Sequence, residues 1–288
     1  MLTLLALGAC ERASAPGTAE AGGEEEPAAP ALALYRRELL FLPAGEEGGA
    51  VVLTAQVRPA ADRALRGTHA WLRRGGEWTP LLQDQWEAAP LRQPWRILPH
   101  GTLRVLVEDG GELESLIFGR AADAPRLNQG PVSGEWTSGP QARVLLREGE
   151  LLAGAAAAPG LVLDVELGAT ALPATPMGAA LFLIDGDGTA VAALRLPEGE
   201  LRLLTFAGAL AEEEALVRLE RAGAGWRLVD AEGGDVLAEL QGDRAAADPD
   251  TVADPHALPT RPPATVRGWL RNEEGRRDVR GLLLGEAP

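Results

Sequence analysis

Apolar residues recur at every second position in short runs along this chain, and a glycine-containing turn follows most of these runs. One run holds Leu103, Val105 and Val107, and a return run over 113–118 follows the turn Asp109-Gly110-Gly111. A period of two residues is typical of β-strands, and glycine supplies the positive φ that tight hairpins need. The same layout recurs around glycine turns at 68–82, 144–153, 181–196 and 217–229. We therefore predict an all-β body of about sixteen strands, in which only 210–221 competes as a helix.

Two strands have an environment that their composition predicts. Along 161–167 the odd positions are leucine or valine, whereas Asp164 and Glu166 occupy even positions, which indicates a half-buried strand. The segment 181–184 is apolar throughout, so we expect it to be covered on both faces.

Segments rich in proline, glycine and small polar residues interrupt the hairpins at 120–140 and 242–263. The first divides the body into near halves, so we predict two β-domains, over 34–125 and 126–288. A lone two-stranded hairpin is barely stable. We therefore expect the terminal hairpin, 264–284, to complete the sheet of the second domain.

The first ten residues form an apolar run that ends Leu7-Gly8-Ala9-Cys10. Such a run is typical of a secretory signal, and it is shorter than the roughly 20 residues that span a bilayer. The four residues also resemble the lipobox of bacterial lipoproteins, in which the cysteine is lipidated and begins the mature chain. We interpret residues 1–9 as a signal peptide, with a buried core cysteine as the alternative. No Arg or Lys precedes Cys10, so we expect the leader to begin upstream of Met1; the alternative is that Met1 is the true start and export is poor.

The segment that follows Cys10 contains mainly Ala, Gly, Pro and Glu. A stretch without large apolar side chains cannot offset the entropy lost on ordering. We predict that residues 10–33 form a flexible acidic tether. With a lipidated cysteine, the tether would hold the body on a bacterial membrane, facing the periplasm.

The second half of the chain contains a strand–turn–strand pattern at 181–188 and 192–195, with the sequences LFLIDGDG and AALR, and closing segments VRGW at 266–269 and DVRG at 278–281. In these segments it resembles the hydroxyneurosporene-synthase-like (AttH-type) proteins, which are built from two lipocalin domains. The resemblance implies two antiparallel β-sandwich or lipocalin-like barrel domains built from consecutive hairpins. It also implies, as one alternative, an enzyme that acts on a lipid or isoprenoid-like substrate.

Charge and composition exclude several kinds of site. The net charge of −15 argues against nucleic acid as a partner, and the absence of lysine excludes Schiff-base chemistry. The single cysteine excludes an internal disulfide and multi-cysteine metal sites. The segment Asp185-Gly186-Asp187-Gly188 has the spacing of calcium ligands, but Leu196 occupies the twelfth position, so we interpret it as a hairpin turn. We predict no catalytic residue, cofactor or metal.

The seven tryptophans are the most distinctive side chains, and five of them fall in the first half of the chain. Tryptophan with arginine is typical of interaction surfaces, although large aromatics also plug the ends of β-barrels. Both interpretations stay open. The predicted ligand or partner surface comprises Trp71, Trp78, Trp86, Trp95, Arg73, Arg96, His69 and His100.

Three functions remain. The leading hypothesis is a non-catalytic, membrane-tethered envelope lipoprotein that binds an apolar ligand or an envelope protein. The second is an enzyme on a two-lipocalin scaffold, with buried Asp, Glu or His in a barrel mouth as its acid and base. The third is a purely structural envelope protein.

Overall fold

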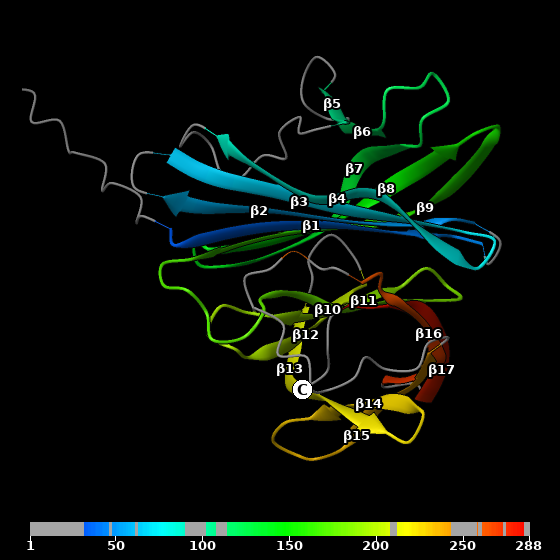
Figure 1. Cartoon of the computed structure of the whole chain (residues 1–288). Helices are drawn as coiled ribbons and strands as arrows, with labels where there is room; N and C mark the ends of the chain where they lie inside the picture. The colour runs from blue at the N-terminus through cyan, green and yellow to red at the C-terminus, as the bar shows by residue number, and fades with distance from the viewer. Residues whose placement is uncertain are drawn as a thin grey trace, which may run out of the picture. The chain divides into compact units, whose positions relative to one another are not determined.

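The computed structural model describes residues 32–45, 48–60, 63–89, 102–107, 114–207, 212–242, 258, 261–272 and 275–284. All regular structure within these ranges is β, in seventeen antiparallel strands (Figure 1). No described segment is a helix of the length and hydropathy needed to cross a membrane. The predicted all-β class is confirmed.

Nine strands form one antiparallel sheet in the order β4-β3-β2-β1-β9-β8-β7-β6-β5. Two runs of consecutive hairpins, β1 to β4 and β5 to β9, meet where β1 pairs with β9. The strands are β1 (Leu34–Pro43), β2 (Ala50–Ala60), β3 (Arg63–Arg74), β4 (Glu77–Ala89), β5 (Leu103–Val107), β6 (Glu114–Phe118), β7 (Arg126–Ser138), β8 (Ala142–Ala153) and β9 (Ala156–Ala169).

The remaining eight strands form a closed barrel in which every strand pairs with its neighbour in the chain and β17 returns to β10. This is the lipocalin-like, hairpin-built barrel that the sequence predicts. The strands are β10 (Gly178–Asp185), β11 (Ala190–Arg195), β12 (Leu201–Phe206), β13 (Glu212–Ala222), β14 (Gly225–Asp230), β15 (Val236–Gly242), β16 (Ala264–Asn272) and β17 (Gly275–Leu283).

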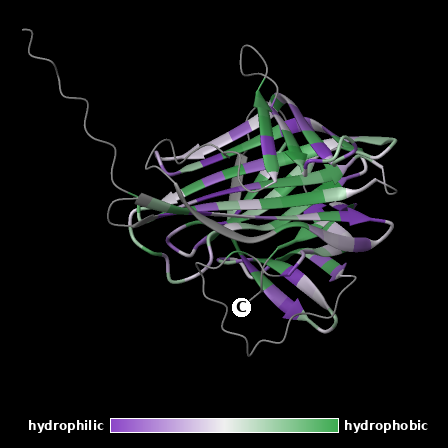
Figure 2. Cartoon of the chain, turned by 45° about the horizontal axis from the view of Figure 1, so that its top comes forward, coloured by the Kyte–Doolittle hydropathy of each residue, from purple (hydrophilic) through white to green (hydrophobic). Residues whose placement is uncertain are grey.

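Three apolar cores follow from the alternation of side chains along the strands (Figure 2). One fills the barrel. The second lies between the sheet and the barrel, and it includes Leu40 and Phe182. The third lies on the opposite face of the sheet, where Leu82 of β4 and Leu103 of β5 share one cluster although their strands are the two edges. The sheet therefore curls around that face. We call the two faces of the sheet the barrel-facing face and the inner face.

Two strands are buried as their composition predicts, with one difference. The segment 181–184 is buried throughout: Phe182 and Ile184 pack against the sheet, whereas Leu181 and Leu183 fill the barrel, as predicted. The alternation along β9 is also present. Its polar face is not open to solvent, however, because Asp164 is 2% exposed on the inner face of the curled sheet.

The boundary expected between 125 and 126 falls between β6 and β7, inside the nine-stranded sheet. The first domain continues to Ala169, and the barrel begins at Gly178. The segment 120–140 is thus mainly a strand, because a register shift between Gln129 and Val132 accommodates its glycine and proline.

Two local predictions also differ from the structure. The turn expected at 148–150 is part of the continuous strand β8, and the chain turns at Gly154, where φ is +68°. The possible helix at 210–221 is a strand over its described part, β13. Alternating Val217 and Leu219 fill the barrel core, and this burial outweighs the helix propensity of the residues before them.

Candidate functional site

Four of the eight residues predicted to form a ligand or partner surface have described side chains, and all four lie on the barrel-facing face of the sheet. His69, Trp71 and Arg73 alternate along β3, and Trp78 of β4 pairs with Arg73. His69 and Trp71 are 2% and 7% exposed, with their ring centroids 5.1 Å apart. Trp78 packs against the core between sheet and barrel. The side chains that lie outside the described set are Trp86, Trp95, Arg96, His100 and Cys10.

Polar side chains on the two neighbouring strands extend this group. Glu38 of β1 pairs with Thr54 of β2, and Thr54 pairs with His69. Side chains directly opposite each other on antiparallel strands have Cβ atoms about 5 Å apart, so these three form one continuous row. Each is at most 2% exposed, and Gln56, beside the row, is fully buried. We call Glu38, Thr54 and His69 the polar row.

Glu38 joins the polar row to the barrel. Its Oε2 accepts a hydrogen bond from the backbone N–H of Ala179 at 2.6 Å, and its Oε1 accepts one from Arg36 Nε at 2.7 Å. Gly178 has a φ of +137°, and a Cβ there would lie 2.6 Å from the same carboxylate. The backbone at the start of β10 thus contacts the Glu38 carboxylate directly. Only glycine at position 178 permits this approach, because any other residue would place a Cβ there.

A second polar cluster lies on the inner face, one residue away along β1. Arg37 donates from Nε and Nη2 to the two carboxylate oxygens of Asp164, at 2.8 and 2.7 Å, in a bidentate pair. Glu114 lies 3.3 Å from Arg37 Nη2 and accepts from Gln129. Burial alone would lower the pKa of Arg37, but the attraction of Asp164, Glu114 and Glu166 outweighs it and holds that pKa well above its ordinary value. We call this group the Arg37 cluster.

Glu166 is the member of the Arg37 cluster that reaches a cavity. One of its oxygens lies 3.4 Å from Arg37 Nε, and its side chain is 18% exposed. Burial raises its pKa to about 7, because the attraction of Arg37 only partly offsets desolvation and Asp164 repels the charged form. The cavity, of about 200 Å³, is also bordered by Thr137, Gln141 and Arg143. A carboxyl that titrates near neutral pH at a cavity can act as a general acid or base.

Burial and the negative charge of Glu166 raise the pKa of the neighbouring Tyr35 well above its usual range, so the phenol stays protonated. Tyr35 and the carboxylates of the Arg37 cluster, Glu114, Asp164 and Glu166, were not among the predicted site residues. The available signal is the run Tyr35-Arg36-Arg37-Glu38 inside an otherwise apolar strand. A charged residue almost never lies fully buried unless it is paired, so charges within a buried strand indicate partners on other strands.

Among the described residues, no group of three or more His, Cys, Asp or Glu side chains is arranged to hold a metal ion. Asp185 Oδ1 accepts the backbone N–H groups of Asp187 and Thr189, each at 2.9 Å, and its Oδ2 lies 3.2 Å from Arg277. These bonds stabilise the turn between β10 and β11, in line with the hairpin interpretation of this segment.

Comparison with known proteins gives a likeness of fold. No protein-family model and no curated protein matches the chain. Kievitone hydratase from Nectria haematococca superposes with a TM-score of 0.50 at 8% sequence identity, over 88% of this chain and 90% of that protein. A Nitrosomonas europaea protein that carries the description AttH superposes with a TM-score of 0.45 at 14% identity, over 93% of this chain and 98% of its own. At 8% identity the likeness to the hydratase is one of fold alone, and it agrees with the two-domain, lipocalin-like arrangement of the strands.

Proposed function

We propose that this protein is an envelope lipoprotein whose two-domain, lipocalin-like body binds a mainly apolar small molecule at the polar row. One observation carries the proposal. The polar row is buried beside Trp71, with Gln56 as a further buried polar side chain, on a face whose core between sheet and barrel is apolar.

The cost of burying polar groups supports a ligand site over plain packing. A buried polar group left without a hydrogen bond costs about 1–3 kcal/mol, whereas apolar side chains would join the two domains without that risk. Sites for apolar ligands, by contrast, combine aromatic and apolar walls with a few polar groups that orient the ligand. His69 and Thr54 have this position next to Trp71, with Trp78 farther along the same face.

The lipobox-like segment and the acidic composition of the tether support the membrane-bound part of the proposal. Lipidation at Cys10 would place the body at a bacterial membrane, facing the periplasm. A ligand site between two domains of a tethered protein would suit the uptake or retention of a molecule released from that membrane.

A second candidate function is catalysis by general acid–base chemistry on a lipid or isoprenoid-like substrate. The specific observation that favours it is Glu166, whose pKa near 7 at a cavity is suited to proton transfer. One protein of similar fold is a hydratase by name. In this reaction class a carboxyl would exchange a proton with a carbon or oxygen atom of the substrate while Arg37 and Tyr35 stay protonated.

The test of ligand binding starts with the full chain purified without organic solvent. Extraction followed by mass spectrometry is expected to release an apolar molecule, and His69→Leu and Trp71→Ala variants are expected to lose it. Leu106→Ala is the control, because Leu106 is an exposed apolar residue of β5, at the opposite end of the strand order from β3 and β4. If the wild type yields no molecule and does not bind an apolar fluorescent probe such as 1-anilinonaphthalene, the binding proposal fails.

The same material separates binding from catalysis. The extracted molecule is returned to the protein in D₂O, and its mass is followed. Deuterium incorporation that is lost in Glu166→Gln supports catalysis. Binding without any change in mass supports the non-catalytic proposal.

A further inference from the structure

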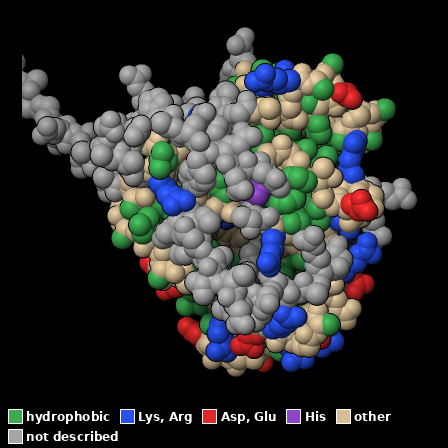
Figure 3. Space-filling view, viewed as in Figure 1, with side chains coloured by type: hydrophobic (Ala, Val, Ile, Leu, Met, Phe, Trp, Pro, Cys, Tyr) green, Lys and Arg blue, Asp and Glu red, His purple; other side chains and the backbone are tan. Residues whose placement is uncertain are grey.

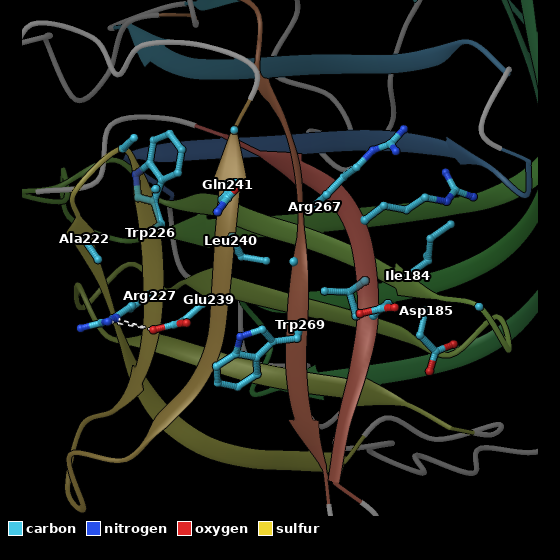
Figure 4. Close-up of a pocket in the computed structure, with 18 of the residues that line it drawn as sticks. Ile184, Asp185, Ala222, Trp226, Arg227, Glu239, Leu240, Gln241, Arg267 and Trp269 are labelled. Carbon is cyan, nitrogen blue, oxygen red and sulfur yellow. Dashed lines mark hydrogen bonds and ion pairs between the residues drawn. The ribbon is translucent and has the colours of Figure 1, made fainter.

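A further cavity bordered by described residues lies away from the polar row and the Arg37 cluster. It has a volume of about 1140 Å³. Residues of strands β14 to β17, the end of β10 and Ala44 line it (Figure 4). Leu240 and Val279 fill the barrel core, so the residues that alternate with them lie on the outer face of the barrel wall. Its volume is that of a site for a ligand of drug size or larger.

The β16–β17 hairpin brings arginines together on this outer face. Arg267 pairs directly with Arg280, and Arg271 pairs with Arg276, with Trp269 between the two pairs. Like charges directly opposite each other on antiparallel strands destabilise a sheet. The chain has 42 acidic residues and a net charge of −15, and Figure 3 shows Arg side chains interspersed with Asp and Glu over the barrel. Two arginine–arginine pairs on one hairpin face are thus a local conflict of the kind that marks functional sites.

Two of these side chains are held in place by the structure. Arg280 donates from Nη2 to the backbone oxygen of Ala44 at 2.7 Å, and also to that of Pro43. These two bonds fix the position of the guanidinium at the edge of the cavity. The Arg276 guanidinium lies 3.9 Å from the centroid of the Trp269 ring, which orients the ring as a platform.

The acidic side chains of the cavity are mostly paired. Glu239 accepts from Arg227 at 2.8 Å, and Asp185 lies 3.2 Å from Arg277. Asp278, opposite Trp269, offsets one positive charge of the hairpin. Among the described residues on this face of the hairpin, the arginines nevertheless outnumber the acidic side chains.

We propose that this cavity binds the anionic head group of an amphiphile, a carboxylate or a phosphate, between Arg267 and Arg280, with the apolar part of the ligand over Trp269. Guanidinium groups recognise such oxyanions by paired, charge-assisted hydrogen bonds. An indole platform two residues from Arg267 gives the apolar part a surface to cover. This site is separate from the polar row, and the proposal does not depend on it.

The test uses the full chain and isothermal titration calorimetry with dodecyl phosphate below its micelle concentration. Inorganic phosphate and vesicles of phosphatidylglycerol are the two parallel probes. We expect dodecyl phosphate to bind at least tenfold more tightly than inorganic phosphate. Arg267→Gln and Arg280→Gln are each expected to weaken binding about tenfold. Asp278→Asn is expected to tighten it, a gain that misfolding cannot produce.

Arg218→Gln is the matched control, because Arg218 is an exposed arginine of the same barrel that pairs with Glu220 outside the cavity. Vesicle binding that is lost in Arg267→Gln, without binding of free dodecyl phosphate, supports the head-group site and makes a bilayer lipid its source. The proposal is overturned if none of the three probes binds. It is also overturned if inorganic phosphate binds as tightly as dodecyl phosphate, or if Arg218→Gln weakens binding as much as Arg267→Gln.

Discussion

Replacing Glu166 by glutamine is expected to stabilise the protein at neutral and alkaline pH. Burial raises the pKa of this carboxyl from 4.5 to about 7, so the folded protein disfavours its charged form. Glutamine has nearly the same shape but carries no charge. The variant therefore removes the cost of ionising a carboxylate beside Asp164 and Glu114.

The sign and size follow from linkage between folding and proton binding. Below pH 4.5 the carboxyl is protonated in both folded and unfolded chains, and it contributes no difference in stability. Between pH 4.5 and about 7 only the unfolded chain releases the proton, so the free energy of unfolding falls as pH rises. At about 1.4 kcal/mol per pH unit, the full loss above pH 7 is about 3–3.5 kcal/mol. The Glu166 side chain is 18% exposed, so solvent makes this an upper value.

The measurement is thermal and urea unfolding of the wild type and Glu166→Gln at pH 4.5 and pH 8. At pH 4.5 the two are expected to unfold at the same midpoint. At pH 8 the variant is expected to have the higher Tm, by roughly 6–12 °C for a body of this size. Glu220→Gln is the control, because Glu220 is an exposed carboxylate in a pair with Arg218 at 3.6 Å and contributes little.

One result would refute this reasoning. If Glu166→Gln lowers the Tm at pH 8, the ionised carboxylate stabilises the folded protein through Arg37, and folding does not raise its pKa. A difference between variant and wild type that is the same at both pH values would also contradict it, because the effect would then not arise from titration.

Three further changes have defined outcomes. Gly178→Ala is expected to lower the urea midpoint strongly, because φ is +137° and the new Cβ would meet a buried carboxylate, whereas Gly186→Ala, with open space around it, is expected to be neutral. Asp164→Asn leaves the Arg37 guanidinium buried without its bidentate partner, and we expect a loss of about 3 kcal/mol in chemical denaturation. Cys10→Ser, expressed with a complete leader, is expected to abolish labelling by a fatty-acid probe and to leave the β-rich circular dichroism spectrum unchanged; unlabelled wild type would contradict the lipoprotein proposal.

The strands were predictable because alternation along a strand is a local property. The segment 181–184 needed no knowledge of its partners to be identified as covered on both faces, and both faces are buried. Glycine turns were predictable where glycine supplies a positive φ, as at Gly75 and Gly223.

The turn predicted at 148–150 was wrong because glycine there allows a neighbouring side chain to approach the backbone closely. A Cβ on Gly149 would lie 2.5 Å from Val162 Cγ2, so glycine there admits a neighbouring side chain within a continuous sheet. A sequence window cannot separate this role from a turn. The domain boundary was misplaced for a related reason, since Pro131 and its flanking glycine lie within a bulged strand.

The candidate site was only partly predictable, because its members come together through pairing of distant strands. His69 and Trp71 stood out by residue type. Glu38 did not, because its contact with Ala179 spans 141 residues of sequence. The bidentate pair of Arg37 and Asp164 spans 127 residues.

The position of β1 inside the sheet explains why both polar clusters occur where they do. β1 pairs with β2 on one side and β9 on the other. One of its faces packs against the barrel, and the other lies inside the curled sheet. Adjacent residues of a strand point to opposite faces. Arg37 is therefore buried on the inner face of the sheet, and Glu38 is buried on the barrel-facing face. Each must find partners, because an unpaired buried charge costs several kcal/mol. Glu38 accepts hydrogen bonds from Arg36 and from the backbone of Ala179 at the start of the barrel, and Arg37 pairs with Asp164. The strand that joins the two halves of the sheet thus also fixes the sheet to the barrel and holds the carboxylates of the inner face.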